Sequence, residues 1–260
     1  LARSPVIPLD DGTWMPTTPP WAEYAGPLAL FADGGNWFTH GAFGGRDSLI
    51  GSLYLVISEV LDPREGGTDA MIKTHQQLFT VHNAGLSQPY YCRHDHIHIV
   101  RDEVKEFLKT YYNQFTALQD RETYTFWEHY FYVSQHKTHE EGWFLMQTRW
   151  MLWMEEGDSI RFLRAIPRRW LENGKEIRLE RIATCFGPAT LKARSRLAKR
   201  RIEAEVSFDG KNVPREVVIR LPHPKGLKPL RVEGGEYDAA TESVRVSPFT
   251  GRAKVRLIFR

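Results

Sequence analysis

TLKARSR at Thr190–Arg196 and RIEAEVSF at Arg201–Phe208 are the two stretches that decide the fold of the C-terminal part of the chain. In both, apolar and charged residues alternate, which is typical of a β-strand with one buried and one solvated face. Turn residues such as Asp209-Gly210 and Gly234-Gly235 follow such runs. The remaining β-like runs are Glu176–Ala183, Glu216–Leu221, Leu230–Glu233, Ser243–Val246 and Lys254–Phe259. We therefore expect a small antiparallel β-sandwich over residues 166–260.

The first 165 residues show helical patterns instead. Apolar residues predict helices over Asp47–Leu61, Asp69–Asn83, Asp102–Leu118 and Gly142–Glu156. The last helix opens with Thr138-His139-Glu140-Glu141, in which a Thr cap and a Glu three positions on form a capping box. Ser87–Ile99 is expected to be extended. The expected fold class is α plus β in two domains, with a helical domain over 1–165 and the sandwich over 166–260.

The composition favours a globular chain with many aromatic residues. Hydrophobic residues make up 42% of the chain, and eight residues are Trp, which is more than a core of this size usually needs. Large aromatic rings on loops are suited to holding sugars, because the C–H face of a pyranose packs on a ring. The two cysteines, Cys92 and Cys185, do not form a disulfide framework and leave the cellular compartment undecided.

Charge is distributed unevenly along the chain. Residues 1–160 contain 11 Lys and Arg against 21 Asp and Glu, whereas residues 161–260 contain 24 against 11. Opposite signs favour mutual attraction of the two halves or a basic face for a polyanion. Because the basic residues alternate with apolar ones, a solvated sheet face explains them, and no nucleic-acid partner is expected. No apolar stretch is long enough to span a membrane, so no membrane partner is expected either.

A loop before the first expected helix carries the first candidate site. Gly44-Gly45-Arg46-Asp47-Ser48 follows Trp37-Phe38 and precedes an apolar helix. Asp47 suits a helix N-terminus, where it caps the helix and meets the helix dipole. An Arg–Asp pair can also grip adjacent sugar hydroxyls, since the guanidinium donates hydrogen bonds and the carboxylate accepts them.

These residues resemble a known enzyme superfamily. Trp37-Phe38 followed by Gly45-Arg46-Asp47-Ser48 is similar to the W-G-R-D-T or W-P-R-D element of six-hairpin, (α/α)6-barrel glycosidases, among them glucoamylases and glycogen debranching glucosidases. The segment Tyr124–Tyr130, YTFWEHY, is similar to their F-Y-E-x-Y element, which holds a carboxylate base. The resemblance implies an α/α-toroid-type helical domain, hydrolysis of a terminal glycosidic bond and a carbohydrate substrate.

The resemblance also implies partners and roles. The chain supplies fewer helices than such a barrel contains, so it would be the C-terminal portion of a longer enzyme, or another chain or a second copy would complete the toroid. Arg46 and Asp47 would hold the terminal sugar, and Trp37 would stack on it. The other substrate-binding candidates are His40, Trp127 and His94. No cofactor is expected.

Carboxylates near the second motif are the catalytic candidates. Inverting glycosidases need two carboxyl groups about 6.5–9.5 Å apart, one protonated and one ionised, with a water between them. Glu128, Glu140 and Glu141 lie close in sequence among aromatic residues, and apolar neighbours raise a carboxyl pKa toward the range of a working acid. We expect Glu128 to activate water, and Glu140 or Glu141 to protonate the leaving oxygen.

Two functions other than hydrolysis remain open, a polysaccharide lyase and a carbohydrate-binding protein, and a zinc site is a separate possibility. If Ser87–Ile99 is extended, His94, His96 and His98 share one face and could bind zinc, although no second ligand cluster supports such a site and we expect no metal. The same histidines, with Tyr90 and Tyr91, would also suit a polysaccharide lyase acting on a uronate-containing glycan. The third reading is a non-catalytic carbohydrate-binding protein, which would need the aromatic residues but not the carboxylates.

Overall fold

The computed structural model describes residues 60, 62–65, 68–69, 94–127 and 136–260, and the backbone of two short strands before them. The chain divides into two compact units, Leu1–Gln147 and Thr148–Arg260, here called the helical unit and the sheet unit. The two short strands, β1 (Val6–Pro8) and β2 (Trp14–Pro16), pair antiparallel in the helical unit. None of the described helices is long and apolar enough to cross a membrane.

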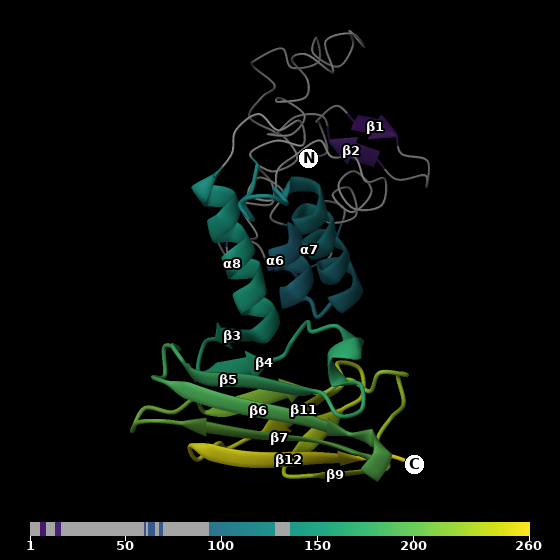
Figure 1. Cartoon of the computed structure of the whole chain (residues 1–260), viewed down its shortest axis with the longest axis vertical. Coiled ribbons are helices and arrows are strands. Elements are labelled where there is room, and N and C mark those ends of the chain that lie inside the picture. Colours follow the sequence, from purple (N-terminus) through teal and green to yellow (C-terminus); the bar gives the residue numbers. More distant parts are fainter. Residues whose placement is uncertain are drawn as a thin grey trace, which may run out of the picture. The chain divides into compact units, whose positions relative to one another are not determined.

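Two five-stranded sheets build the sheet unit (Figure 1). One has the order β10-β11-β8-β4-β3, with β3 at Trp153–Glu156, β4 at Ser159–Phe162, β8 at Glu216–Arg220, β10 at Glu236–Asp238 and β11 at Ser243–Val246. The other has the order β5-β6-β7-β12-β9, with β5 at Glu176–Ile182, β6 at Ala189–Arg196, β7 at Arg201–Phe208, β9 at Arg231–Glu233 and β12 at Arg252–Ile258. The seven runs expected from alternation coincide with β5 to β9, β11 and β12, and these expectations are confirmed.

The pairing of β6 with β7 shows why the strands form where they do. Every second residue of both strands is buried, and the register sets Leu191 opposite Val206 and Ala193 opposite Ala204. Fully burying a side chain such as Leu or Val contributes about 1.5–3 kcal/mol. The buried faces of the two sheets meet where the ring of Phe208 lies 6.5 Å from that of Phe162 in β4. The alternation therefore marks the side of the sheet that faces the core.

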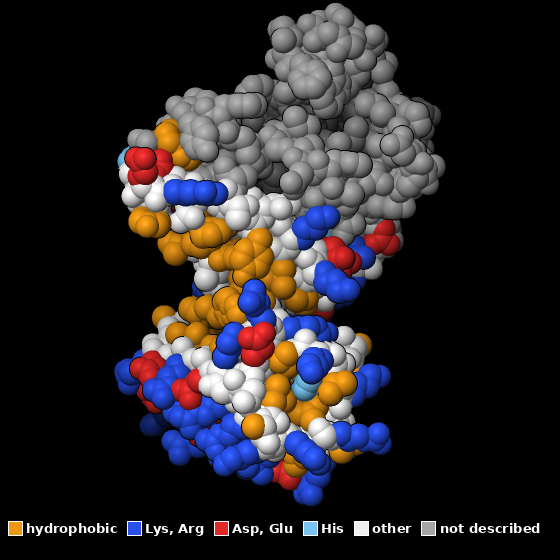
Figure 2. Space-filling model, turned by 45° about the vertical axis from the view of Figure 1, so that its right-hand side comes forward, with side chains coloured by type: hydrophobic (Ala, Val, Ile, Leu, Met, Phe, Trp, Pro, Cys, Tyr) orange, Lys and Arg blue, Asp and Glu red, His pale blue; other side chains and the backbone are white. Residues whose placement is uncertain are grey.

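The solvated face of the same sheet carries ion pairs across the strands. Glu203 on β7 accepts from Arg196 at 3.2 Å, and Arg256 on β12 bonds Glu233 on β9 at 2.9 Å. Lys254 pairs with Glu205 at 2.5 Å. Basic residues of this half are thus cross-strand partners, as an ordinary sheet surface requires. Figure 2 shows many Lys and Arg side chains over the sheet unit.

One pair of strands corrects the expectation of an antiparallel sandwich. β4 and β8 pair parallel, with Ile160 opposite Val217 and Phe162 opposite Ile219. The chain between them leaves the first sheet, forms β5, β6 and β7 in the second, and returns. A long excursion of this kind lets the returning strand run in the same direction, whereas a tight turn would force it to run antiparallel.

The glycine pair between β9 and β10 carries the chain from one sheet to the other. Gly234 lies against the backbone of β12, where an added Cβ would overlap the carbonyl oxygen of Lys254. A Cβ added at Gly235 would likewise overlap the carbonyl oxygen of Arg245, in the segment of β11. The crossing is therefore possible only without a side chain at either position.

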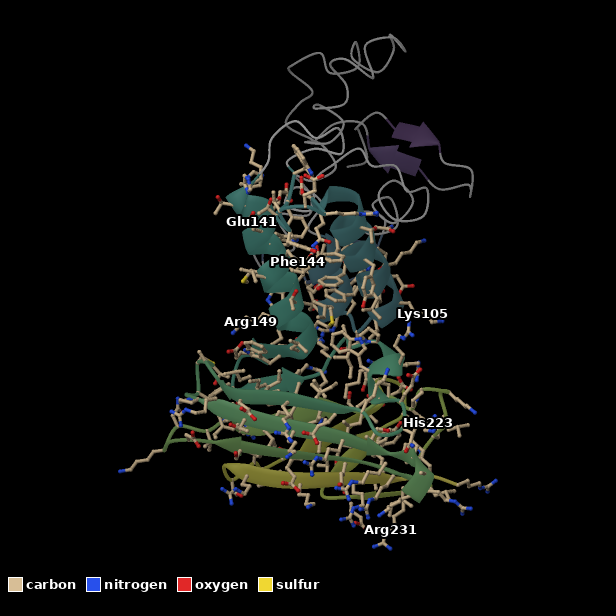
Figure 3. The ribbon with its side chains drawn as sticks, viewed as in Figure 1. Lys105, Glu141, Phe144, Arg149, His223 and Arg231 are labelled. Atoms are coloured by element: carbon tan, nitrogen blue, oxygen red, sulfur yellow. The ribbon has the colours of Figure 1, made fainter. Side chains whose placement is uncertain are left out.

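Three α-helices belong to the described residues: α6 at His94–Val100, α7 at Val104–Leu118 and α8 at Thr138–Leu152. An aromatic cluster packs between α7 and α8 in the helical unit. Phe144, labelled in Figure 3, projects from α8. Its ring lies 5.5 Å from that of Tyr111, 5.4 Å from that of Phe115 and 5.1 Å from that of Phe126. Phe126 follows a turn in which Asp120 Oδ1 accepts hydrogen bonds from the backbone N–H groups of Glu122 and Thr123.

The expected fold class, an α/α-toroid-type helical domain followed by a small antiparallel β-sandwich, is wrong. The described part of the chain is mostly β, with two five-stranded sheets and three α-helices. The expected helices over Asp47–Leu61 and Asp69–Asn83 lie largely outside the described residues. The expected helix over Asp102–Leu118 is confirmed as α7 within two residues.

Two further expectations in the helical part need correction. α8 ends at Leu152 and does not continue to Glu156, because Trp153–Glu156 forms a hairpin with β4 through Gly157, whose φ is +59°. A glycine with positive φ at the first position of a two-residue loop favours this hairpin over a longer helix. His94–Val100 is helical instead of extended.

The glycine crossing predicts a large steric effect. Gly234→Ala should lower the free energy of unfolding by at least about 2 kcal/mol more than Gly174→Ala. Both glycines have positive φ, +88° and +85°, but a Cβ at Gly174 meets no heavy atom within 4 Å. Urea denaturation of the full chain measures both. Equal losses in the two variants would contradict the close approach to Lys254.

Candidate active site

A buried carboxyl group on α6 has a pKa well above its ordinary value. Asp95 is 0% exposed, and burial raises the pKa of its carboxyl to about 6 from 3.8. The indole Nε1–H of Trp143 donates to Asp95 Oδ1 at 3.4 Å, and the side chain of Gln147 also bonds this carboxyl. Both partners belong to α8. These hydrogen bonds lower the pKa again, but burial outweighs them, so Asp95 keeps its proton to an unusually high pH.

The face of α8 that meets Asp95 carries a second buried carboxyl. Glu140 is 0% exposed, and it precedes Trp143 by three residues and Gln147 by seven. Residues at this spacing share one face of a helix. His139 Nε2 lies 3.4 Å from Glu140 Oε1. The fold therefore brings Glu140 to the side of α8 that also supplies the partners of Asp95.

An ion pair lies one helical turn beyond Asp95. The buried His98 bonds Glu103 through Nδ1 and Oε2 at 2.7 Å, and Arg101 Nε lies 3.0 Å from Glu103 Oε1. Although partial burial opposes it, the hydrogen bond from His98 and the charges of His98 and Arg101 lower the pKa of Glu103. Asp95 and Glu103 thus have pKa values shifted in opposite directions, with the imidazole of His98 acting on both carboxyls.

Asp95 holds its proton more tightly, and Glu103 less tightly, than a free carboxyl group does. A carboxyl kept neutral near pH 6 beside an indole has the protonation state of a general acid, and an ionised carboxylate has that of a base. Titratable groups whose surroundings separate their pKa values are the usual mark of acid–base chemistry.

The structure places only some of the residues proposed from the sequence. Glu140 is brought to the buried face of α8, whereas Glu141 is half-buried near the start of that helix. Trp127 is half-buried and follows Phe126 of the aromatic cluster. His94 begins α6, but its side chain is outside the described part. The residues that lie outside the described part altogether are Glu128, Arg46, Asp47, Trp37 and His40.

The alternative zinc site required a strand at His94–His98. These residues belong to α6 instead, and successive alternate residues on a helix do not share a face. Within the described residues no group of three or more His, Cys, Asp or Glu side chains is arranged to bind a metal ion. The interpretation of a one-faced histidine row is therefore wrong.

The sequence interpretation missed Asp95 as a candidate. It lies within a histidine-rich segment, HDHIHIV, whose alternating pattern resembles a strand. A helical interpretation places Asp95 and His98 one turn apart, on the same face. The sequence signal for this residue is a single acid close to the apolar residues Ile97 and Ile99, which the structure shows to be buried.

No known protein-family model and no curated protein matches this chain.

The raised pKa of Asp95 predicts a pH-dependent stability effect. In the unfolded chain the carboxyl ionises near 3.8, but in the folded protein it does so only near 6. Asp95 therefore contributes its full stability below about pH 3.8, and this contribution falls as the pH rises to about 6, by about 3 kcal/mol in total. Asp95→Asn stays neutral, so its unfolding free energy relative to the wild type should rise by that amount between about pH 2.5 and 7.

Urea denaturation of the full chain at each pH measures this difference. Glu122→Gln, which removes an exposed carboxyl from the same unit, is the matched control and should show a constant difference. A pH-independent difference for Asp95→Asn would mean that the carboxyl is ionised in the fold.

Proposed function

We propose that the helical unit belongs to a glycoside hydrolase that cleaves a terminal sugar by carboxyl acid–base catalysis. The observation that carries this proposal is the buried Asp95, whose pKa is raised to about 6 while Trp143 donates to its carboxylate. Glycosidic oxygen is a poor leaving group unless it is protonated, and a carboxyl group of this kind can supply the proton near neutral pH.

The proposal gives each residue a role. Asp95 is the proton donor, and Glu140, on the facing side of α8, is the second carboxyl of the site. Glu128 activates the attacking water, since it lies in the motif that resembles a glycosidase base. Phe126, two residues before Glu128, accepts from the backbone N–H of Lys137, three residues before Glu140. This hydrogen bond joins described residues that are close in sequence to Glu128 and to Glu140, which supports assigning the two glutamates to one site.

The residues proposed to bind the sugar are those identified by the sequence motifs. Arg46 and Asp47 hold the hydroxyls of the terminal sugar, and Trp37 stacks on its apolar face. His40, His94 and Trp127 are further contacts. The partner of the protein is a carbohydrate, and the proposal includes no cofactor.

Asp95→Asn and Glu140→Gln test the roles directly. Each should lower kcat by about 10²–10⁴-fold and leave KM within a few-fold, because general acid–base groups act mainly in the transition state. The assay follows the release of reducing ends by the full chain from neutral and uronate-containing oligosaccharides. Glu122→Gln, at an exposed carboxyl of the same unit, should keep wild-type activity and serves as the matched control.

Other outcomes would overturn the proposal in recognisable ways. Cleavage accompanied by absorbance near 235 nm, from an unsaturated uronate, would identify a lyase. Unchanged kcat in both Asp95→Asn and Glu140→Gln would remove the carboxyl site from the chemistry. Sugar binding without any cleavage would indicate a carbohydrate-binding protein.

A further inference from the structure

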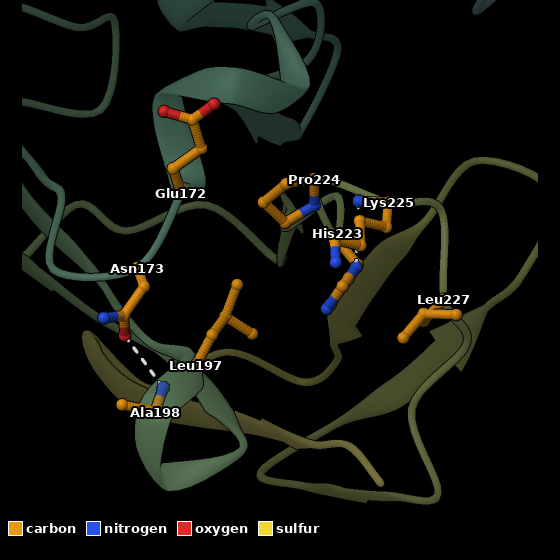
Figure 4. Close-up of a pocket in the computed structure, with 8 residues that line it drawn as sticks. All are labelled: Glu172, Asn173, Leu197, Ala198, His223, Pro224, Lys225 and Leu227. Atoms are coloured by element: carbon orange, nitrogen blue, oxygen red, sulfur yellow. Dashed lines mark hydrogen bonds between the residues drawn. The ribbon is translucent and has the colours of Figure 1, made fainter.

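The sheet unit contains a pocket of about 490 Å³ at the end of the β6–β7 hairpin (Figure 4). Three segments form it: the residues after the 3-10 helix η3 (Arg168–Leu171), the 3-10 turn η4 (Leu197–Lys199) between β6 and β7, and the loop between β8 and β9. The lining includes Glu172, Asn173, Leu197, His223, Lys225 and Leu227.

Contacts between these segments hold the pocket open in a defined shape. Asn173 Oδ1 accepts from the backbone N–H of Ala198 at 2.8 Å, which joins the first segment to η4. Arg168 donates to the backbone oxygen of His223 at 3.0 Å, which joins η3 to the β8–β9 loop. The His223 ring lies 4.7 Å from that of Phe259. The walls are therefore tied to the strands and to each other.

The polar groups of the pocket are mostly hydrogen-bond donors. His223 Nδ1 accepts from the backbone N–H of Lys225 at 3.0 Å, so the proton of the neutral ring is on Nε2. Burial and the charges of Lys225 and Arg168 lower the pKa of His223, which keeps the ring neutral. The carboxylate of Glu172 pairs with Lys175 at 2.8 Å. The Nε2–H of His223 and the ammonium of Lys225 remain to meet a ligand that accepts hydrogen bonds.

Apart from the Glu172 carboxylate, which pairs with Lys175, the charged side chains at the pocket are basic. Lys199 and Arg200 directly follow the lining residues of η4, and Lys228 follows those of the β8–β9 loop. Within the described part of the chain, these three side chains and Lys225 form no ion pair, in contrast to the cross-strand pairs on the sheet face. The apolar side chains of Leu197 and Leu227 complete the lining, and Leu227 is 50% exposed. A ligand here would meet an apolar wall beside an uncompensated positive field.

We propose that this pocket binds a carboxylate group carried on an apolar body, with Lys225 and the Nε2–H of His223 as donors and Leu197 and Leu227 as the apolar wall. Two sources offer that chemistry, a uronate residue of an acidic oligosaccharide and a free aliphatic carboxylate. The site belongs to the sheet unit, and it does not depend on the carboxyl site of the helical unit.

Isothermal titration of the full chain with three probes tests the proposal. The probes are trigalacturonate, hexanoate and the neutral sugar maltotriose. Lys225→Ala should weaken carboxylate binding at least about tenfold, because it removes a charge-assisted hydrogen bond. Lys228→Ala is the matched control, since it removes the same charge from the same loop outside the lining, and it should change affinity less than about threefold by long-range charge alone. Leu227→Asp, at an exposed position, should abolish binding without disturbing the core.

The three probes and the variants distinguish the two possible ligands and show which results would contradict the proposal. Binding of trigalacturonate alone identifies an acidic glycan, and binding of hexanoate alone identifies a free carboxylate; either supports the site if Lys225→Ala weakens it. Maltotriose binding with equal affinity would overturn the requirement for a negative charge. Equal losses in Lys225→Ala and Lys228→Ala would show general attraction to the basic surface. Absence of binding by all three probes would overturn the site.

Discussion

The sheet unit depends on the pairing of β6 with β7. Eight consecutive cross-strand pairs, from Ala189 with Phe208 to Arg196 with Arg201, set one buried face and one solvated face for the whole sheet. A slip of one residue would turn the buried set outward and place charges in the core. β5 and β12 extend this register on either side, and Phe208 carries the contact to Phe162 in the other sheet. The pocket follows from the same pairing, because η4, which lines it, is the turn that joins β6 to β7.

The helical unit contains a different constraint, the burial of a carboxyl group. Removing a carboxylate from water is costly, and the fold meets that cost by leaving Asp95 protonated over a wider pH range. The donors from Trp143 and Gln147 do not cancel the effect of burial. Stability alone would be served as well by an apolar residue at this position, since buried polar networks often contribute little to stability. A group kept buried against that preference is a stronger candidate for chemistry than an exposed acid such as Glu122.

Sequence patterns predicted the sheets well and the helical part poorly, for physical reasons. In β6 and β7, apolar residues alternate with polar ones because one face of each strand is buried, so the sequence alone predicts these strands. In His94–Val100 the same alternation arises on a short helix buried on several sides, and the pattern no longer distinguishes helix from strand. Trp150 and Trp153 follow helical spacing, yet the hairpin at Gly157 ends α8 between them. Of the site, Glu140 could be predicted from its aromatic neighbours, whereas Asp95 is identified only by its burial and by its contacts with Trp143 and Gln147 on α8.

The structure shows where the basic residues of the C-terminal half lie and which of them have acidic partners. A net excess of 13 basic residues in 161–260 suggests an extended polyanion face when it is read from composition. On the sheet, however, Arg194, Arg256 and Lys254 are matched to Glu176, Glu203, Glu233 and Glu205 in cross-strand pairs. Matched pairs on a solvated face contribute little long-range field, because water and salt screen them. Part of the excess lies around η4 and the β8–β9 loop, where Lys199, Arg200, Lys225 and Lys228 form no ion pair within the described part of the chain. A small anion that enters the pocket is therefore favoured over a long polyanion lying along the strands.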